Sequence, residues 1–196
     1  MEKISTLFTR AKNGRVTDIL SDHVTPPSVE WLATEKLDGA NVRLTVRSGQ
    51  LVRLEARRNP TRIQKEDGIV HPWYRDAQPE EQRNSDYLLW NAARNTPLMG
   101  VPDGEWSGEA VGPKIQGNPL GLKEHVVFLF SLLPWRETLS STIPLPPVIE
   151  NAPLSFDELA DWLPGQRSQV NKSVNIEGVV WWFFDEPVAK IKVKDF

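Results

Sequence analysis

A lysine stands just before an Asp-Gly turn near the start of the chain. Lys36 follows Glu35 and precedes Asp38 and Gly39, and an alternating strand pattern begins directly afterwards. A lysine amine held beside a strand can act as a nucleophile once it has lost its proton. A surface lysine next to a turn gives the same pattern, so this short motif alone leaves both interpretations open.

Two further segments each place a single carboxylate where it could bind a ligand or an ion. Glu109 lies among three glycines and a proline in the segment 107–118, and Glu177 heads the apolar run 178–184. A charge at the edge of an apolar strand is either solvated or holds a cation. The alternatives are a polar loop without a function for the first segment and a solvated strand end for the second.

A last segment alternates lysine with apolar residues. A period of two places its lysines on one face of a strand and its apolar residues on the other. Lysines brought beside a nucleophilic amine would help it to lose its proton and would neutralise a phosphate. An edge strand protected by lysines is the alternative. The lysines are Lys190, Lys192 and Lys194, and the apolar residues are Ala189, Ile191 and Val193.

The surrounding patterns predict the strands that would carry these residues, and they favour an α+β fold. Ser48 and Gly49 supply the turn of a hairpin, and residues 185–187 are predicted to form the turn of a second one. The strand of residues 126–132 would place Phe128 and Phe130 on one face. The predicted strands cover residues 41–47, 51–57, 126–132, 178–184 and 188–194.

Two helices are expected between the strands. One covers about residues 80–94, and a capping box at Ser155 begins the other, which stops at Pro164 and Gly165. The stretch 137–154 contains four prolines and is expected to form an ordered surface loop. The apolar stripe of the first helix would consist of Tyr87, Leu88, Trp90 and Ala93.

Composition limits the class of protein. A chain of 196 residues has the length of one domain, and the absence of cysteine excludes disulfides, thiolate metal sites and thiol nucleophiles. Three distant histidines argue against a histidine-rich metal site, and most of the eight tryptophans are expected in the core. Without a signal-peptide pattern or an apolar run of roughly 20 residues, we expect a soluble cytoplasmic protein and no membrane partner.

The net charge of −3 means that any contact with nucleic acid must come from a local patch. The first hairpin and the residues after it offer such a patch, because the window of residues 43–65 contains seven basic residues and a single acid, Glu55. Concentrated positive charge suits backbone phosphates, although a solvated face is the usual reading of such a run. The basic residues are Arg43, Arg47, Arg53, Arg57, Arg58, Arg62 and Lys65.

In their order along the chain and in their amino-acid sequences, these segments resemble the motifs of the covalent nucleotidyltransferase superfamily of polynucleotide ligases and mRNA capping enzymes. Its motifs K-x-D-G, E-G-V-V and K-x-K match residues 36–39, 177–180 and 190–192. The detailed likeness is to the ATP-dependent RNA ligase 2 family, whose motif G-E-x-x-G-P-x-I-Q matches residues 108–116. The segment 3–10 also resembles the start of that family, whereas residues around 60–100 and 135–170 match poorly. The motif E-K-x-x-G-x-N is matched by Glu35, Lys36, Gly39 and Asn41.

The resemblance implies a nucleotidyltransferase fold, with antiparallel sheets around a nucleotide pocket. It implies one such domain over residues 1–196, without the OB-fold or helical C-terminal domain that relatives carry. Lys36 would take AMP from ATP with Mg²⁺ or Mn²⁺, pass it to an RNA 5′-phosphate and let a 3′-hydroxyl displace it. The RNA could be a nicked duplex, and a helper protein could assist its binding.

The resemblance also assigns roles to individual residues. Lys36, Lys190 and Lys192 would be catalytic, and Glu177 and Glu109 would serve the metal. Ser131 stands where the family carries an Asp, which places Phe130 in the adenine-stacking slot, and Arg57 is the alternative to Arg58 as the phosphate contact. The expected nucleotide contacts are Glu35, Asp38, Gly39, Asn41, Arg58, Glu109, Phe130 and Glu177.

Three other functions fit parts of the pattern. A small ATP-dependent DNA ligase and a capping-type guanylyltransferase use the same lysine motif, but Asn41 and the Gly-Pro-x-Ile-Gln stretch favour the RNA ligase. A non-catalytic module that binds nucleic-acid ends need not keep Lys36, Glu109, Glu177 and the K-x-K lysines together.

The histidines His23, His71 and His125 are expected to be surface or hydrogen-bonded residues.

Overall fold

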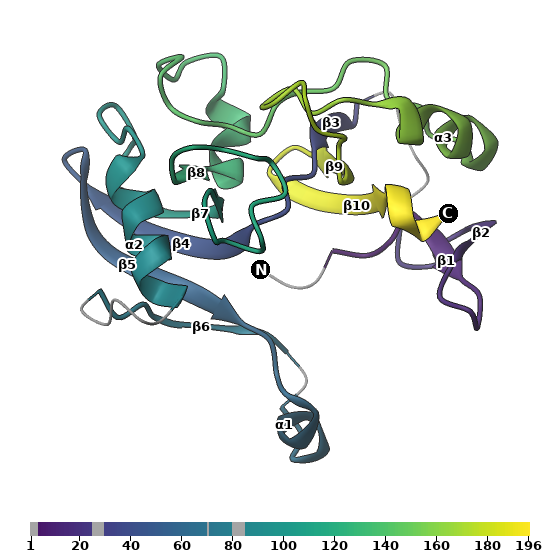
Figure 1. Cartoon of the computed structure of the whole chain (residues 1–196), viewed down its shortest axis with the longest axis horizontal. Coiled ribbons are helices and arrows are strands. Elements are labelled where there is room, and N and C mark those ends of the chain that lie inside the picture. The colour runs from purple at the N-terminus through teal and green to yellow at the C-terminus, as the bar shows by residue number, and fades with distance from the viewer. Residues whose placement is uncertain (1–3, 25–29, 70, 80–84) are drawn as a thin grey trace. The chain divides into compact units, whose positions relative to one another are not determined.

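The computed structural model describes residues 4–24, 30–69, 71–79 and 85–196 (Figure 1). These residues form two compact units. Unit 1 is the continuous stretch Asp38–Leu145, whereas unit 2 combines Ile4–Leu37 with Pro146–Phe196. The chain therefore leaves unit 2 directly after Lys36 and Leu37 and returns to it at Pro146.

Unit 1 is built on a five-stranded antiparallel sheet of order β6-β5-β4-β7-β8. The apolar side chains of β4 alternate as predicted, and Val42, Leu44 and Val46 are completely buried. They pack with Leu89 of α2 in the core of this unit, so one face of the sheet is apolar and the other is left for polar residues. Its elements are β4 (Ala40–Arg47), β5 (Gln50–Arg58), α1 (Arg62–Glu66), β6 (Trp73–Asp76), α2 (Ser85–Asn95), β7 (Gly104–Val111), β8 (Val126–Phe128) and the 3₁₀ helix η1 (Phe130–Trp135).

Unit 2 contains the three-stranded sheet β10-β9-β3 and the small hairpin β1-β2. The central strand β9 is buried on both faces, from Val179 to Trp182, which explains its continuous apolar sequence. Leu159 of α3 and Leu7 complete the core on which this sheet rests. The elements are β1 (Phe8–Arg10), β2 (Val16–Leu20), β3 (Leu32–Glu35), α3 (Phe156–Trp162), η2 (Leu163–Gly165), β9 (Gly178–Phe183), β10 (Glu186–Lys192) and η3 (Val193–Asp195).

The structure confirms the α+β class, the hairpin β4–β5 and its turn, where Ser48 and Gly49 take positive φ angles of 50° and 71°. The strand predicted over 126–132 is wrong in its second half, because β8 ends at Phe128 and a 3₁₀ helix follows. An apolar run of this length fits either a strand or a buried helical turn. The helical turn buries Leu132 and Leu133 instead.

The second hairpin also differs from its prediction. Phe184 and Asp185 form the turn, Phe184 with a φ of 53°, while Glu186 and Pro187 belong to β10. A proline is tolerated there because β10 is an edge strand of its sheet. This strand ends at Lys192, so Lys194 lies in η3 and does not share the strand face of the other two lysines.

The first helix prediction is correct in type but not in its buried face. Residues 80–84 lie outside the described part, and from Ser85 onward the buried helix residues are Asp86, Leu89, Ala92 and Ala93. Asp86 displaces the expected stripe because it is an ion-pair centre for two arginines. Helix α3 begins after Ser155 as predicted, but the predicted capping box does not form. The Ser155 side chain makes no capping hydrogen bond to the helix backbone, and its hydroxyl donates to the Glu158 carboxylate at 2.6 Å instead.

The predictions for the loop of residues 137–154 and for the tryptophans are correct only in part. Residues 137–154 contain neither helix nor strand beyond a single bridge at Val148, but Ile143 and Ile149 are buried. Of the tryptophans, only Trp181 and Trp182 are fully buried within the described residues. No helix in the described ranges is long and apolar enough to cross a membrane.

Candidate functional site

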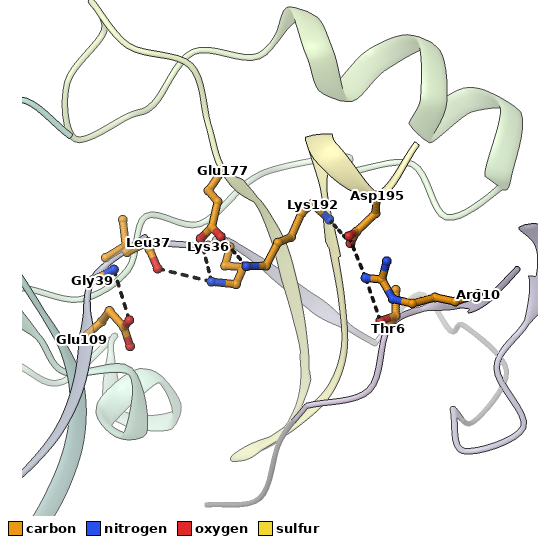
Figure 2. A network of polar contacts seen from close by, with 9 residues as sticks. All are labelled: Thr6, Arg10, Lys36, Leu37, Gly39, Glu109, Glu177, Lys192 and Asp195. Atoms are coloured by element: carbon orange, nitrogen blue, oxygen red, sulfur yellow. Dashed lines mark hydrogen bonds and ion pairs between the residues drawn. The ribbon is translucent and has the colours of Figure 1, made fainter. Parts of the chain in front are cut away.

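Unit 2 brings Lys36, Glu177 and Lys192 into direct contact (Figure 2). The Nζ of Lys36 donates to Glu177 Oε2 at 2.6 Å, and the Nζ of Lys192 donates to Oε1 at 2.5 Å. The three side chains are only 15–21% exposed. Two ammonium groups around one carboxylate leave one net positive charge, so this lysine–carboxylate centre suits a phosphate.

The strands explain why these side chains meet. Glu35, the last residue of β3, pairs with Val179, and the next residue donates its backbone N–H to the Gly178 carbonyl at 2.9 Å. On the other side of β9, Lys192 pairs with Gly178. A Cβ at Gly178 would overlap the carbonyl oxygen of Ile191. Glycine thus allows the close approach of β10 that brings Lys192 to the carboxylate beside it.

Two other predicted residues lie next to this centre in the chain. Glu35 is 2% exposed, and its Oε2 accepts a hydrogen bond from the backbone N–H of Gln169 at 2.8 Å. Its Oε1 is buried and has no hydrogen-bond partner among the described residues. Lys190 is fixed through its backbone, which exchanges hydrogen bonds with Leu7 and Ser5 at 2.8 and 3.0 Å.

Unit 1 gathers a second set of predicted residues on the polar face of its sheet. Strand register places Glu109 opposite Asn41. Val42 pairs with Ala56 of β5, and the same register continued by one residue brings Arg57 beside Asn41. Tyr74 follows opposite Arg57 on β6, and its hydroxyl donates to Asn41 Oδ1 at 2.6 Å. Glu109 Oε1 accepts from the Gly39 N–H at 3.2 Å. The row across the sheet therefore combines a carboxylate, an amide, a guanidinium and a phenol.

Arg58 lies outside this row. Its guanidinium donates to Asp86 at 2.7 Å, and Asp86, which is completely buried, also pairs with Arg75 at 2.8 Å. By contrast, Arg57 belongs to the row, and its Nε is buried without a hydrogen-bond partner in the described part of the chain. This geometry makes Arg57 the better placed of the two for an anion.

Phe130, the aromatic residue expected to stack on adenine, lies in a 3₁₀ helix and not in the predicted strand. Phe130 is 7% exposed and begins η1, so it shares no strand face with Phe128. Phe128 pairs with Glu109 on β7 and is half-buried. Ser131, where the family carries an Asp, hydrogen-bonds the Ser107 backbone through its hydroxyl, accepting at 2.8 Å and donating at 3.1 Å.

Asp38 and Gly39 open unit 1 directly after the nucleophile candidate. Asp38 is partly exposed, and a Cβ at Gly39 would overlap the carbonyl oxygen of Ala110. The glycine of the motif is therefore required by the contact between the start of β4 and β7. His23 and His71 are exposed, and His125 Nε2 hydrogen-bonds the Pro113 carbonyl at 2.7 Å, as expected for structural histidines.

Most arginines of the predicted basic patch are neutralised locally. Arg43 pairs with Glu55 at 2.6 Å and with Glu105 at 3.3 Å. The Glu55 hydrogen bond raises the pKa of the Arg43 guanidinium above its ordinary value. Arg53 is held by Asp76 at 2.7 Å, a hydrogen bond that raises its pKa. Counting charges in residues 43–65 therefore overstated the free positive charge, because most of the acids that pair with these arginines lie elsewhere in the sequence.

The described residues contain no group of three or more His, Cys, Asp or Glu that could hold a metal ion. Glu177 is a single carboxylate whose two oxygens already hold lysines, and Glu109 belongs to the other unit. This donor set fits Mg²⁺ or Mn²⁺ only if water and phosphate oxygens supply most ligands, which is how Mg²⁺ is usually bound.

Sequence reasoning missed several residues that hold the candidates in place. Tyr74 positions Asn41, and it comes from the stretch around 60–100 where the resemblance is poor. Arg10 and Asp195 join the network beyond Lys192 (Figure 2). No local pattern could have found that pair, because the two residues are 185 positions apart.

A comparison with protein families decides what this architecture belongs to. The RNA ligase family model matches residues 29–192, which contain the lysine–carboxylate centre and the polar row. The chain belongs to the RNA ligase family. No curated protein matches it.

Solved RNA ligases support this assignment at the level of the fold. An RNA ligase from Naegleria gruberi, solved as a mutant with ATP and Mn, has a TM-score of 0.53 at 17% identity and covers 99% of this chain and 62% of its own. The same ligase with PPi gives 0.52 at 18% identity, over 84% of this chain and 49% of its own. This RNA ligase family member thus spans about half to three-fifths of the matched chains.

Proposed function

We propose that this chain is the catalytic module of an ATP-dependent RNA ligase. Lys36 Nζ would attack the α-phosphorus of ATP, so that an N–P bond forms, the bond to pyrophosphate breaks and the amine loses a proton. AMP would then pass to an RNA 5′-phosphate, and a 3′-hydroxyl would displace it. The lysine–carboxylate centre of Lys36, Glu177 and Lys192 carries this proposal, since it lies within the match to the family.

The contacts of the centre indicate what each group would do. The Lys36 ammonium donates to Glu177 at 2.6 Å, and it must lose a proton before its nitrogen lone pair can attack. Lys192, held on the other carboxylate oxygen, would donate to a phosphate as negative charge builds on it. Lys190, two residues away on β10, is proposed to assist it.

A divalent cation, Mg²⁺ or Mn²⁺, would neutralise phosphate charge when bound. Glu177 is proposed to hold it, with Glu109 as the second carboxylate. The Naegleria gruberi ligase was solved with ATP and Mn, which supports this choice of cofactors.

The remaining predicted residues are proposed as nucleotide contacts. Phe130 stays the proposed stacking residue, while Arg57 is now preferred to Arg58 because the latter is bound to buried Asp86. The other proposed contacts are Glu35, Asp38, Gly39, Asn41 and Glu109. ATP is proposed in preference to GTP, and the substrate would be RNA with 5′-phosphate and 3′-hydroxyl ends, including nicks in a duplex.

The test is covalent labelling of the protein. Wild-type chain incubated with labelled ATP and Mg²⁺ should retain the label on a denaturing gel, and labelled GTP should give much less. Lys36→Ala should lose the label and still melt in a cooperative transition, as a folded chain does. Lys194→Ala, an exposed lysine of η3, is the matched control and should label normally. Persistent labelling of Lys36→Ala would place the nucleophile elsewhere and overturn the proposal.

A further inference from the structure

The network of Figure 2 continues from Lys192 to two residues that the proposed function does not use. Asp195 is 3% exposed, and its Oδ2 accepts a hydrogen bond from the backbone N–H of Lys192 at 2.9 Å. Its Oδ1 pairs with Arg10 Nη2 at 2.6 Å. Arg10 also donates to the Gly14 carbonyl at 2.5 Å, so the guanidinium is fixed from both sides. Asp195 is thereby connected to the β1–β2 hairpin.

The segment before β1 also holds β10, at a position two residues before Lys192. Thr6 forms a parallel bridge with Lys190, through backbone hydrogen bonds that involve Leu7 and Ser5. Leu7 is completely buried in the core of unit 2 and anchors this segment. The backbone of both K-x-K lysines is therefore held by contacts to the residues 5–10, directly at Lys190 and through Asp195 at Lys192.

The chemistry of the pair favours a role in orientation. A buried carboxylate loses its hydration and needs partners to offset that loss, and apolar residues would often stabilise a fold equally well. Here both partners of Asp195 fix the point where β10 ends and η3 begins. The Lys192 ammonium lies 2.5 Å from Glu177, so a small rotation of this strand end would separate them.

We propose that Asp195 and Arg10 are positioning residues for AMP transfer, which hold the end of β10 so that the Lys192 ammonium stays at Glu177. The inference rests on the proposed function for the role of Lys192. Misplacement of a reacting group by about 1 Å can cost about 100-fold in rate. Loosening this clamp without removing Lys192 should cost less than that.

The experiment measures single-turnover formation of lysyl-AMP over a range of ATP concentrations. Asp195→Asn, which keeps the shape, and Arg10→Ala should each lower the rate at saturating ATP by about 10-fold, with the half-saturating ATP concentration changed less than twofold. In a Lys192→Ala background, neither change should lower the rate further, because both act through that side chain. Asp185→Asn and Arg15→Ala, exposed residues of the β9–β10 and β1–β2 turns, are matched controls expected at wild-type rate.

Each outcome decides the matter. Rates within twofold of wild type for both variants, or the same loss in the Lys192→Ala background, would overturn the inference. If Asp195→Asn does not fold, Arg10→Ala alone decides. If the wild-type chain forms no lysyl-AMP, the proposed function fails. Hydrogen exchange of the Lys192 amide then tests the clamp itself, which requires faster exchange in Arg10→Ala than in Arg15→Ala.

Discussion

Replacing Glu177 by glutamine is the sharpest test of the lysine–carboxylate centre. The change keeps the shape of the side chain but removes the charge that balances Lys36 and Lys192, so the net charge of the centre rises from +1 to +2. The amide keeps a single acceptor oxygen, so one of the two ammonium groups loses its partner.

The size of the effect follows from burial. An exposed ion pair contributes up to about 1 kcal/mol, and removing one partner of a fully buried pair costs about 3–5 kcal/mol. The three side chains are 15–21% exposed, between these limits. Because one lysine keeps an acceptor, we expect Glu177→Gln to lower the free energy of unfolding by about 2 kcal/mol, or Tm by about 4–8 °C.

The functional loss should be larger than the loss of stability. We expect lysyl-AMP formation to fall by about 100-fold at temperatures where the variant is folded, because in the proposed function the carboxylate holds both lysines and the metal. The assay is single-turnover labelling with ATP across a Mg²⁺ titration, alongside thermal melts. Glu186→Gln, an exposed carboxylate at the other end of β10, is the control. A rate within threefold of wild type with an unchanged Mg²⁺ titration would refute the reasoning and leave Glu177 as an ordinary strand end.

Two further predictions separate structural from functional residues. Arg58→Ala should lower Tm by about 2–8 °C, since the partly exposed pair with buried Asp86 is worth about 1–2 kcal/mol. Arg57→Ala should change Tm by less than about 2 °C, which corresponds to less than about 1 kcal/mol. Joining of pre-adenylylated RNA should be slowed by Arg57→Ala and not by Arg58→Ala, and the reverse pattern in melts and joining rates would restore Arg58 as the phosphate contact. Gly178→Ala should lower both Tm and the labelling rate, because its Cβ would meet the Ile191 carbonyl and push β10 away from β9. A Gly178→Ala chain that labels as fast as wild type would show that the close approach of these strands is not needed.

Local patterns predicted the parts of this fold that depend on neighbours in the sequence. Strand β4 and its turn followed from alternation and from Ser48-Gly49, and β9 followed from its continuous apolar run. The run 126–132 was misjudged because a buried strand and a buried helical turn have the same composition. The buried face of α2 was predicted wrongly because Asp86 is buried in ion pairs with arginines from β5 and β6. The periodicity of the helix does not reveal these partners.

The candidate site shows the same division. The motif residues Lys36, Glu177 and Lys192 could be named from the sequence because the resemblance ties them to one reaction. The free charge of the basic hairpin could not be predicted, since its partners Asp76 and Glu105 are distant in sequence and meet it only across the sheet. The hydrogen bond from Tyr74 to Asn41 likewise depends on strand order.

The discontinuous make-up of unit 2 has a consequence for the order of events during synthesis. The described part of unit 1 is one continuous stretch, so its hairpins can close as soon as they leave the ribosome. Strand β3, made much earlier than its partner β9, must wait for it, and Lys36 must wait 141 residues for Glu177. A nascent chain would thus carry the proposed nucleophile without the carboxylate and the second lysine. In the proposed function, the capacity to take up AMP would appear only when β9 and β10 have been added, so that it would report the folding of unit 2.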